Sequence, residues 1–180
     1  FKGAWLSSFL SYLGANIYGI ALNPHTKDNI YNSLKSIFKK DLRIDIRNFN
    51  NINKCIKKIQ PDIIFHLAAQ PLVVESYKNP LDTFNTNLMG SLNVLYSIIK
   101  DSKNTKVIMI TSDKCYANEE REEGYKENEP MGGYDPYSSS KGCAELVSSA
   151  YNDSFFLKNN NQALLASVRA GNVIGGGDWA

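Results

Sequence analysis

A tyrosine and a lysine stand four residues apart in the segment Tyr137-Ser-Ser-Ser-Lys141. On a helix, residues at this spacing lie on one side with Cβ atoms about 5–6 Å apart, so the ammonium group of Lys141 can lie close to the phenol of Tyr137. A free phenol titrates near about pH 10, and a neighbouring cation lowers that pKa. The pair could therefore act as a base toward a hydroxyl group. Such pairs also arise by chance, so the spacing alone leaves a plain surface pair open.

A hydroxyl, a carboxylate and an amine follow one predicted strand. Residues 106–111 (KVIMIT) form a short apolar run, and Ser112, Asp113 and Lys114 come directly after it, about 25 residues before Tyr137. In open α/β sheets, ligands bind at the carboxyl ends of the strands. These groups and the Tyr/Lys pair are therefore predicted at one edge of a sheet, although a simple polar turn would also favour Ser and Asp.

Small side chains follow another predicted strand, residues 62–69. Leu67, Ala68 and Ala69 would let a flat ligand approach the backbone closely. Tight packing of a helix against the strand end is the alternative explanation.

Helical and strand-like patterns alternate along the chain. Helical spacing is found in residues 1–13, 52–59, 80–99 and 136–156, and strand-like runs in 17–22, 42–46, 62–69, 106–111 and 163–168. This alternation predicts an α/β fold with a mostly parallel sheet, in which residues 1–180 form a single domain.

The composition excludes several classes of protein. With 43% hydrophobic and 21% charged residues, the 180-residue chain can bury a sizeable core. A formal charge of +2 does not indicate a nucleic-acid partner. No apolar run reaches the about 18 residues of a membrane span and the first residues do not resemble a signal peptide, so we expect a cytoplasmic protein without a membrane partner. Cys55, Cys115 and Cys143 form no CxxC pair and predict buried apolar residues rather than a metal site or disulfides.

Four motifs resemble one known family. HLAAQ at 66–70, TSDK at 111–114, YSSSK at 137–141 and RAGNVIGGGDW at 169–179 are similar to the extended short-chain dehydrogenase/reductase superfamily, and within it to the sugar-nucleotide 4,6-dehydratases. The resemblance covers essentially the whole chain. It implies a Rossmann-like doubly wound parallel sheet, NAD as cofactor, the nucleotide sugar CDP-glucose as substrate, and a homodimer or higher homo-oligomer that pairs through residues 80–100 and 136–156.

The resemblance also implies catalytic roles. Tyr137 would take the proton of the sugar 4-hydroxyl, Lys141 would lower the pKa of Tyr137 and bind the nicotinamide ribose, and Ser112 would bind the same sugar oxygen. Asp113, with a pKa raised by burial, would protonate the departing 6-hydroxyl. Lys114 belongs to the active site in a role that stays open.

Binding residues follow from the resemblance in the same way. Asp45 would accept from the adenine amine and Ile46 would line the ring, although a strand end with a capping Asp is the alternative. The implied cofactor contacts are Gly3, Asp45, Ile46, Leu67, Ala68, Ala69, Asn87, Thr111, Tyr137 and Lys141. The implied substrate contacts are Ser112, Arg169 and Asn172, whereas the glycines at 175–177 indicate turn geometry.

Three departures from the family pattern leave alternatives open. Of the GxxGxxG phosphate loop only Gly3 is present, so the first strand and most of this loop are expected to have no counterpart in the sequence. The C-terminal substrate lobe of the family is also expected to have none. Asn23 stands where many dinucleotide folds carry an acidic residue. No arginine stands beside it to bind the 2′-phosphate of NADP, and this favours NAD. One alternative is a 4-epimerase, which needs no acid at C6; Asp113 and Lys114 favour the dehydratase. The other is that the 180 residues alone are an inactive fragment.

Overall fold

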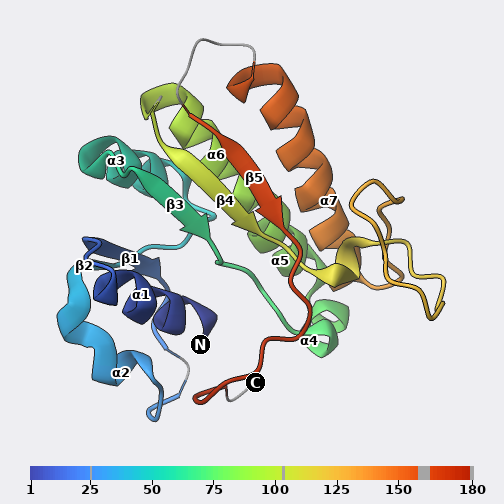
Figure 1. Cartoon of the computed structure of the whole chain (residues 1–180), viewed down its shortest axis with the longest axis horizontal. Coiled ribbons are helices and arrows are strands. Elements are labelled where there is room, and N and C mark those ends of the chain that lie inside the picture. Colours follow the sequence, from blue (N-terminus) through green and yellow to red (C-terminus); the bar gives the residue numbers. More distant parts are fainter. Residues whose placement is uncertain (25, 103, 158–162, 179–180) are drawn as a thin grey trace. The chain divides into compact units, whose positions relative to one another are not determined.

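The computed structural model describes residues 1–24, 26–102, 104–157 and 163–178. They form two compact units, Phe1–Asp45 with Asn172–Ala180, and Ile46–Gly171. Helices and strands alternate along the chain, and all strand pairs of the two sheets are parallel (Figure 1). The predicted α/β class is confirmed.

The smaller unit is built on two paired strands. Its elements are α1 (Lys2–Tyr12), β1 (Ile17–Ala21), α2 (Tyr31–Leu34), the 3-10 turn η1 (Lys35–Ile37) and β2 (Phe38–Arg43). Helix α1 ends where the sequence predicts, since Gly14 adopts a φ of +89°. The strand predicted at 42–46 lies earlier, because pairing with β1 begins at Ile17 opposite Phe38.

The glycine-rich segment near the end of the sequence packs within the same unit. The indole Nε1 of Trp5 donates a hydrogen bond to the carbonyl oxygen of Gly176 at 2.9 Å. Gly177 has a φ of +84°, a backbone conformation that favours glycine. This agrees with the turn predicted from the glycine run.

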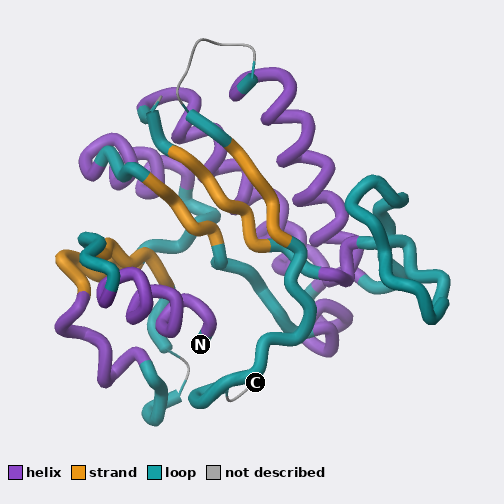
Figure 2. Tube along the Cα trace, viewed as in Figure 1, coloured by secondary structure: helices purple, strands orange, loops and turns teal. Residues whose placement is uncertain are grey.

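The larger unit holds a three-stranded sheet covered by helices. Its elements are α3 (Phe49–Ile59), β3 (Ile63–His66), α4 (Val73–Lys78), α5 (Pro80–Phe84), η2 (Asn85–Met89), α6 (Gly90–Asp101), β4 (Lys106–Ile110), η3 (Asp113–Cys115), α7 (Pro136–Tyr151), η4 (Asn152–Phe156) and β5 (Leu165–Val168). The strand order is β3-β4-β5. Helices α3, α6 and α7 lie along one face of this sheet, and Figure 2 shows its three strands side by side.

The strand orders fit a Rossmann-like fold. In the doubly wound order 3-2-1-4-5-6, the strand that opens the fold lies between two groups of strands. The orders β1-β2 and β3-β4-β5 correspond to these two groups.

The helical stripe predicted from Pro80 to residue 99 is helical throughout but not uniform. Helices α5 and α6 are joined by the π-helical turn η2, which places Asn87 in a buried position. At Gly90, where α6 begins, an added Cβ would lie 2.5 Å from Cδ1 of Ile46. Ile46 therefore packs directly on the helix backbone.

The core of the larger unit joins α3, α6 and β4. Ile52, Leu95, Ile98, Val107 and Met109 are each 1% exposed or less. Within the described ranges no helix combines the length and apolar character needed to cross a membrane. Two of the cysteines predicted as buried are buried, Cys55 and Cys115, whereas Cys143 is partly exposed.

Candidate active site

The first turn of α7 is fixed by its own capping residues. Asp135 accepts hydrogen bonds from the backbone nitrogen of Ser138 at 3.0 Å and from its hydroxyl at 2.6 Å. Pro136 occupies the first helical position, where its missing N–H costs no bond. Gly133, at a φ of +140°, allows the approach to the helix, since an added Cβ would lie 2.5 Å from the nitrogen of Ser139. These contacts hold Tyr137 at the start of α7.

Tyr137 meets Ser112 at the end of β4. A side-chain hydrogen bond with Ser112 lowers the pKa of the phenol. Burial, the largest influence, raises the pKa of Tyr137, and the charges of Asp113 and Asp135 act in the same direction. The net pKa is raised. The role of Lys141 in lowering this pKa stays a prediction.

The charge of Lys141 acts on His66. Lys141 is buried on α7, with 7% of its surface exposed, and His66 is buried at the end of β3. Burial, and secondly the charge of Lys141, lowers the pKa of His66 from 6.5 to about 4. The imidazole is therefore neutral near neutral pH. His66 was not predicted as a site residue, although it opens the HLAAQ motif.

Hydrogen bonds identify the tautomer of His66. Its Nε2 lies 2.9 Å from the hydroxyl oxygen of Ser91. Ser91 donates its hydrogen to the carbonyl oxygen of Asn87 at 2.7 Å. Nε2 of His66 must therefore be the donor to Ser91, which leaves Nδ1 without a proton.

Ser112, Asp113 and Lys114 form a turn, as the strand-end pattern predicts. The hydroxyl of Ser112 donates to Oδ1 of Asp113 at 3.0 Å and accepts from the backbone nitrogen of Lys114 at 3.2 Å. The Lys114 ammonium lies 3.7 Å from Oδ2 of Asp113. Both side chains are half-exposed, 47% for Asp113 and 51% for Lys114. The burial of Asp113 beside the cofactor stays a prediction.

Asn87 ties the loop after β3 to α7. Its Oδ1 accepts from the backbone nitrogen of Gln70 at 2.7 Å, and its Nδ2 donates to the Gln70 carbonyl and, at 2.8 Å, to the hydroxyl of Ser140. The loop residues Leu67, Ala68 and Ala69 lie between His66 and this anchor and are partly exposed. Asn87, predicted to contact the cofactor, thus already anchors the loop that carries three other predicted cofactor contacts.

Two further predicted contacts bond within the protein. Thr111 is buried and donates its hydroxyl to Glu145. Arg169, predicted near the substrate, donates to Glu145 at 2.9 Å, to the phenolic oxygen of Tyr116 at 2.9 Å and to the Glu127 carbonyl at 2.8 Å. Glu145 was missed, and its place four residues after Lys141 is the signal that could have revealed it.

Three predicted residues belong to the smaller unit. Gly3 lies in the first turn of α1, with no atom within 4 Å of an added Cβ. Asp45 is partly exposed just after β2, and Asn172 is exposed at the start of the glycine-rich segment. Their roles stay predictions.

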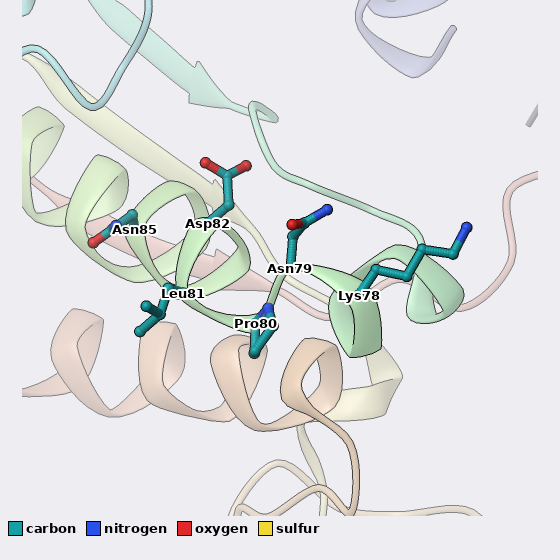
Figure 3. Close-up of a pocket in the computed structure, with 6 residues that line it drawn as sticks. All are labelled: Lys78, Asn79, Pro80, Leu81, Asp82 and Asn85. Atoms are coloured by element: carbon teal, nitrogen blue, oxygen red, sulfur yellow. The ribbon is translucent and has the colours of Figure 1, made fainter.

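A shallow pocket lies elsewhere in the larger unit. It has a volume of about 430 Å³ and is lined by Lys78, Asn79, Pro80, Leu81, Asp82 and Asn85. Figure 3 shows the polar ends of Asn79 and Asp82 on one side of the helix and Leu81 on the other. Asp82 is paired with Arg47. No predicted catalytic or binding residue lines this pocket.

No group of three or more potential metal ligands is found in the part of the chain that the structure describes. Tyr137 and Lys141 lie on α7, and Ser112, Asp113 and Lys114 follow β4. Together they supply a phenol, a hydroxyl, a carboxylate and two amines. A Rossmann-like sheet with these groups defines an extended short-chain dehydrogenase/reductase.

Comparison with known proteins places the chain within this class. Residues 1–167 match the family model described as GDP-mannose 4,6 dehydratase, and the chain belongs to that family. It is 50% identical, over 184 aligned residues, to CDP-glucose 4,6-dehydratase of Salmonella typhimurium, covering 100% of this chain and 51% of the relative. It is 32% identical over 116 residues to CDP-paratose 2-epimerase of Salmonella typhi, covering 56% of this chain and 34% of the relative.

A solved structure supports the fold. The NAD complex of Thermus thermophilus UDP-glucose 4-epimerase superposes with a TM-score of 0.78 at 24% identity, covering 94% of this chain and 51% of that chain. The chain thus spans about half the length of the first of these relatives and of this structure.

Proposed function

We propose that the protein carrying this chain is an NAD-dependent sugar-nucleotide 4,6-dehydratase that converts CDP-glucose to CDP-4-keto-6-deoxyglucose and water. The observation that carries the proposal is the contact of Tyr137 with Ser112, beside Asp113 and Lys114. Membership of the dehydratase family supports the reaction class. The 50% identity to a CDP-glucose 4,6-dehydratase supports the nucleotide.

The residues of the larger unit suit a dinucleotide with a nicotinamide ring. Leu67, Ala68 and Ala69 present small apolar side chains at the end of β3. The hydroxyl of Ser112 and the ammonium of Lys141 are groups that bond ribose or sugar hydroxyls. NAD, when bound, would accept hydride from C4 of the sugar and return it to C6 after water has left, while C5 regains a proton, so that the reaction balances.

Tyr137 acts as the base toward the 4-hydroxyl of the sugar in this proposal. When the hydroxyl of Ser112 turns from Asp113 toward the substrate, it donates to the sugar oxygen that loses its proton, which stabilises negative charge at that point. Because burial raises the pKa of Tyr137, further positive charge near the phenol is needed for it to ionise near neutral pH. Lys141, one helical turn away on α7, is the nearest cation in sequence on the same helix.

Asp113 and Lys114 act on C5 and C6 of the sugar. Oxidation at C4 acidifies the proton at C5, so that one group that removes this proton and one that protonates the leaving hydroxyl complete the elimination. The carboxyl of Asp113 donates to the leaving hydroxyl. The ammonium of Lys114, 3.7 Å from Asp113, stabilises the developing negative charge or, once neutral, removes the C5 proton.

We also propose that the protein forms a homodimer through α5, α6 and α7. Large apolar side chains on these helices are exposed, and monomeric proteins rarely expose such side chains in large clusters. They are Leu81, Met89 and Tyr96 on the α5–α6 stretch and Leu146 and Phe155 on the α7–η4 stretch.

The test is incubation of the full-length protein with NAD and, separately, CDP-glucose, dTDP-glucose and GDP-mannose. We expect a 4-keto-6-deoxy product from CDP-glucose, identified by its mass and by the ultraviolet absorbance of the ketone in alkali. Epimerised sugar with no loss of water would instead support the 4-epimerase alternative. Tyr137→Phe should abolish product formation and leave binding of CDP-glucose nearly unchanged; turnover by this variant would refute the assigned base.

A further inference from the structure

Glu145 lies at the centre of a buried network on α7. Its side chain is 5% exposed, and its carboxylate accepts hydrogen bonds from three side chains on or directly after two strands. The donors are Thr111 at the end of β4, Ser167 on β5 at 2.9 Å, and Arg169 after β5 at 2.9 Å. Burial would raise the pKa of Glu145, but the bonds from Arg169, Thr111 and Ser167 outweigh it and hold the pKa below its usual range. The carboxylate is therefore charged and fully engaged.

Glu145 shares its side of α7 with the proposed catalytic pair. Tyr137, Lys141 and Glu145 follow one another at four-residue steps, so they lie along neighbouring parts of one helix surface. The helix is thereby bonded to the end of β4 only one residue before Ser112. Rotation or sliding of α7 would move Tyr137 away from Ser112 and would also break the bonds of Glu145.

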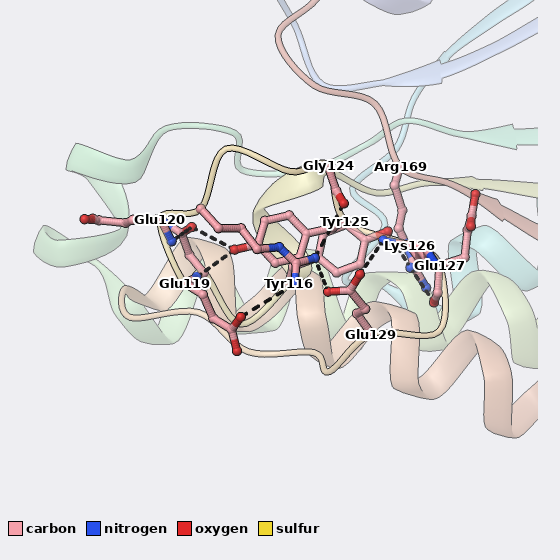
Figure 4. Close-up of polar contacts among 11 residues, drawn as sticks. Tyr116, Glu119, Glu120, Gly124, Tyr125, Lys126, Glu127, Glu129 and Arg169 are labelled. Carbon is pink, nitrogen blue, oxygen red and sulfur yellow. Dashed lines mark hydrogen bonds and ion pairs between the residues drawn. The ribbon is translucent and has the colours of Figure 1, made fainter.

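Arg169 extends the network to the loop that leads into α7. Its guanidinium lies 5.0 Å from the ring centroid of Tyr116, to whose hydroxyl oxygen it also donates. Tyr116 stacks on Tyr125 with centroids 5.0 Å apart and planes at 18°, and Arg121 lies 4.3 Å from the Tyr125 ring on that loop. Figure 4 shows Arg169 reaching Tyr116 and Glu127, with Tyr125 beside Tyr116.

Tyr116 directly follows the turn that carries Ser112, Asp113 and Lys114. It is 8% exposed, and Cys115 before it is fully buried. The carbonyl of Cys115 accepts from the nitrogen of Gly132 at 2.8 Å, which joins the turn to the segment entering α7. An added Cβ at Gly142 would lie 3.3 Å from the Cys115 carbonyl, so α7 also packs directly on this turn.

We infer that Glu145 and Arg169 are positioning residues that fix α7 against the turn after β4, and so set the contact between Tyr137 and Ser112. The inference deepens the proposed dehydratase function, and the expected effect on catalysis rests on that proposed function. Arg169 acts through Tyr116 and Glu145 and not as a substrate contact, because three of its five guanidinium N–H groups already bond to the protein.

The first test follows the titration of Tyr137 in the full-length protein, and so does not depend on activity. The ring carbon bonded to the phenol oxygen is labelled with ¹³C, and its signal is assigned by its loss in Tyr137→Phe. Because the Ser112 bond lowers the pKa of Tyr137, we expect Glu145→Gln to raise that pKa, as Ser112→Ala should. An unchanged titration in Glu145→Gln would overturn the inference.

The second test uses steady-state kinetics with CDP-glucose. We expect Glu145→Gln and Arg169→Met each to lower kcat by about tenfold or more with little change in KM, since small displacements of catalytic groups cost up to about 100-fold. The double variant should lose less than the product of the two single effects, because the groups belong to one network. Arg169→Lys should recover part of the loss through its remaining charge on Glu145. A rise in KM for Arg169→Met with normal kcat, and no effect of Glu145→Gln, would identify Arg169 as a substrate contact and overturn the inference.

The matched control is Lys57→Met. Lys57 Nζ on α3 lies 3.0 Å from Oδ1 of Asp101, and this variant removes the cation of that ion pair. Asp101 ends α6 shortly before β4 begins, so the pair lies at the edge of the sheet opposite the site. We expect normal kcat and an unchanged Tyr137 titration.

If Glu145→Gln does not fold, as judged by circular dichroism, Tyr116→Phe replaces it, because this variant keeps the ring and loses the oxygen that accepts from Arg169. If the unaltered protein converts none of the three nucleotide sugars, the proposed function fails, and the titration of Tyr137 still decides the positioning roles.

Discussion

His66 should make the stability of the protein depend on pH in a window that its pKa defines. The folded protein holds this imidazole neutral, buried at the end of β3, where its Nε2 donates to Ser91. Burial first, and the charge of Lys141 second, lowers its pKa from 6.5 to about 4. In the unfolded chain neither influence acts. The unfolded chain therefore takes up a proton first as the pH falls, and this favours unfolding.

The size of the effect follows from the two pKa values. At about 1.4 kcal/mol for each pH unit between them, the lowering from 6.5 to about 4 corresponds to about 3 kcal/mol. This contribution to stability is fully present above about pH 6.5 and is lost progressively as the pH falls to about 4. Below that pH the folded protein also binds the proton, and the loss stops growing.

The assay is urea unfolding of the protein and of His66→Gln at a series of pH values across this window. The glutamine amide can still donate to Ser91 but does not titrate. All other titrating groups are common to both proteins, so the difference in unfolding free energy isolates the imidazole. We expect the unaltered protein to lose about 3 kcal/mol more than the variant between the two pKa values. Parallel curves for the two proteins would refute the burial of a neutral imidazole.

Three further outcomes follow from local geometry. Gly133→Ala should destabilise the protein by more than about 1 kcal/mol in urea unfolding, because φ is +140° and the added Cβ would lie 2.5 Å from backbone, whereas Gly124→Ala, with no atom within 4 Å, should be nearly neutral. Leu95→Ala, at a fully buried position, should cost about 2–5 kcal/mol in the same assay. Cys115 should resist thiol reagents in the folded protein while partly exposed Cys143 reacts faster, as mass spectrometry can show, because burial and the charge of Glu145 raise the pKa of the Cys115 thiol to about 11.

The elements that the sequence predicts well are those whose apolar spacing reflects burial on one side. Helix α3 begins after its capping residue Asn48 and buries Ile52, Cys55 and Ile56, three of the four positions that predicted it. Strand β2 was placed too late because its residues, FKKDLR, are largely charged and paired with β1 alone, so they carry little apolar signal. The short helices α2 and α4 were missed for a similar reason: neither has a buried apolar residue.

The site shows a different limit. Strand-end reasoning brings Tyr137 and Ser112 to one edge of the sheet, and the structure confirms their contact, because the carboxyl end of a strand and the start of the following helix lie close together in such folds. The same reasoning cannot tell whether a polar side chain at that edge faces a ligand or bonds to the protein. Thr111 and Arg169 both bond to Glu145, which no motif singled out.

Whether these side chains face a ligand or bond to the protein decides how charge is distributed around Tyr137. The charge of Lys141 also acts on His66, and burial is the largest influence on the pKa of Tyr137. The bond from Ser112 is the influence that favours the phenolate, so the ionisation of Tyr137 depends on how closely α7 is held to the end of β4. Glu145, bonded to Thr111, Ser167 and Arg169, supplies that restraint. Base strength at Tyr137 is therefore a property of the packing between the helix and two strand ends, which the spacing of a tyrosine and a lysine does not contain.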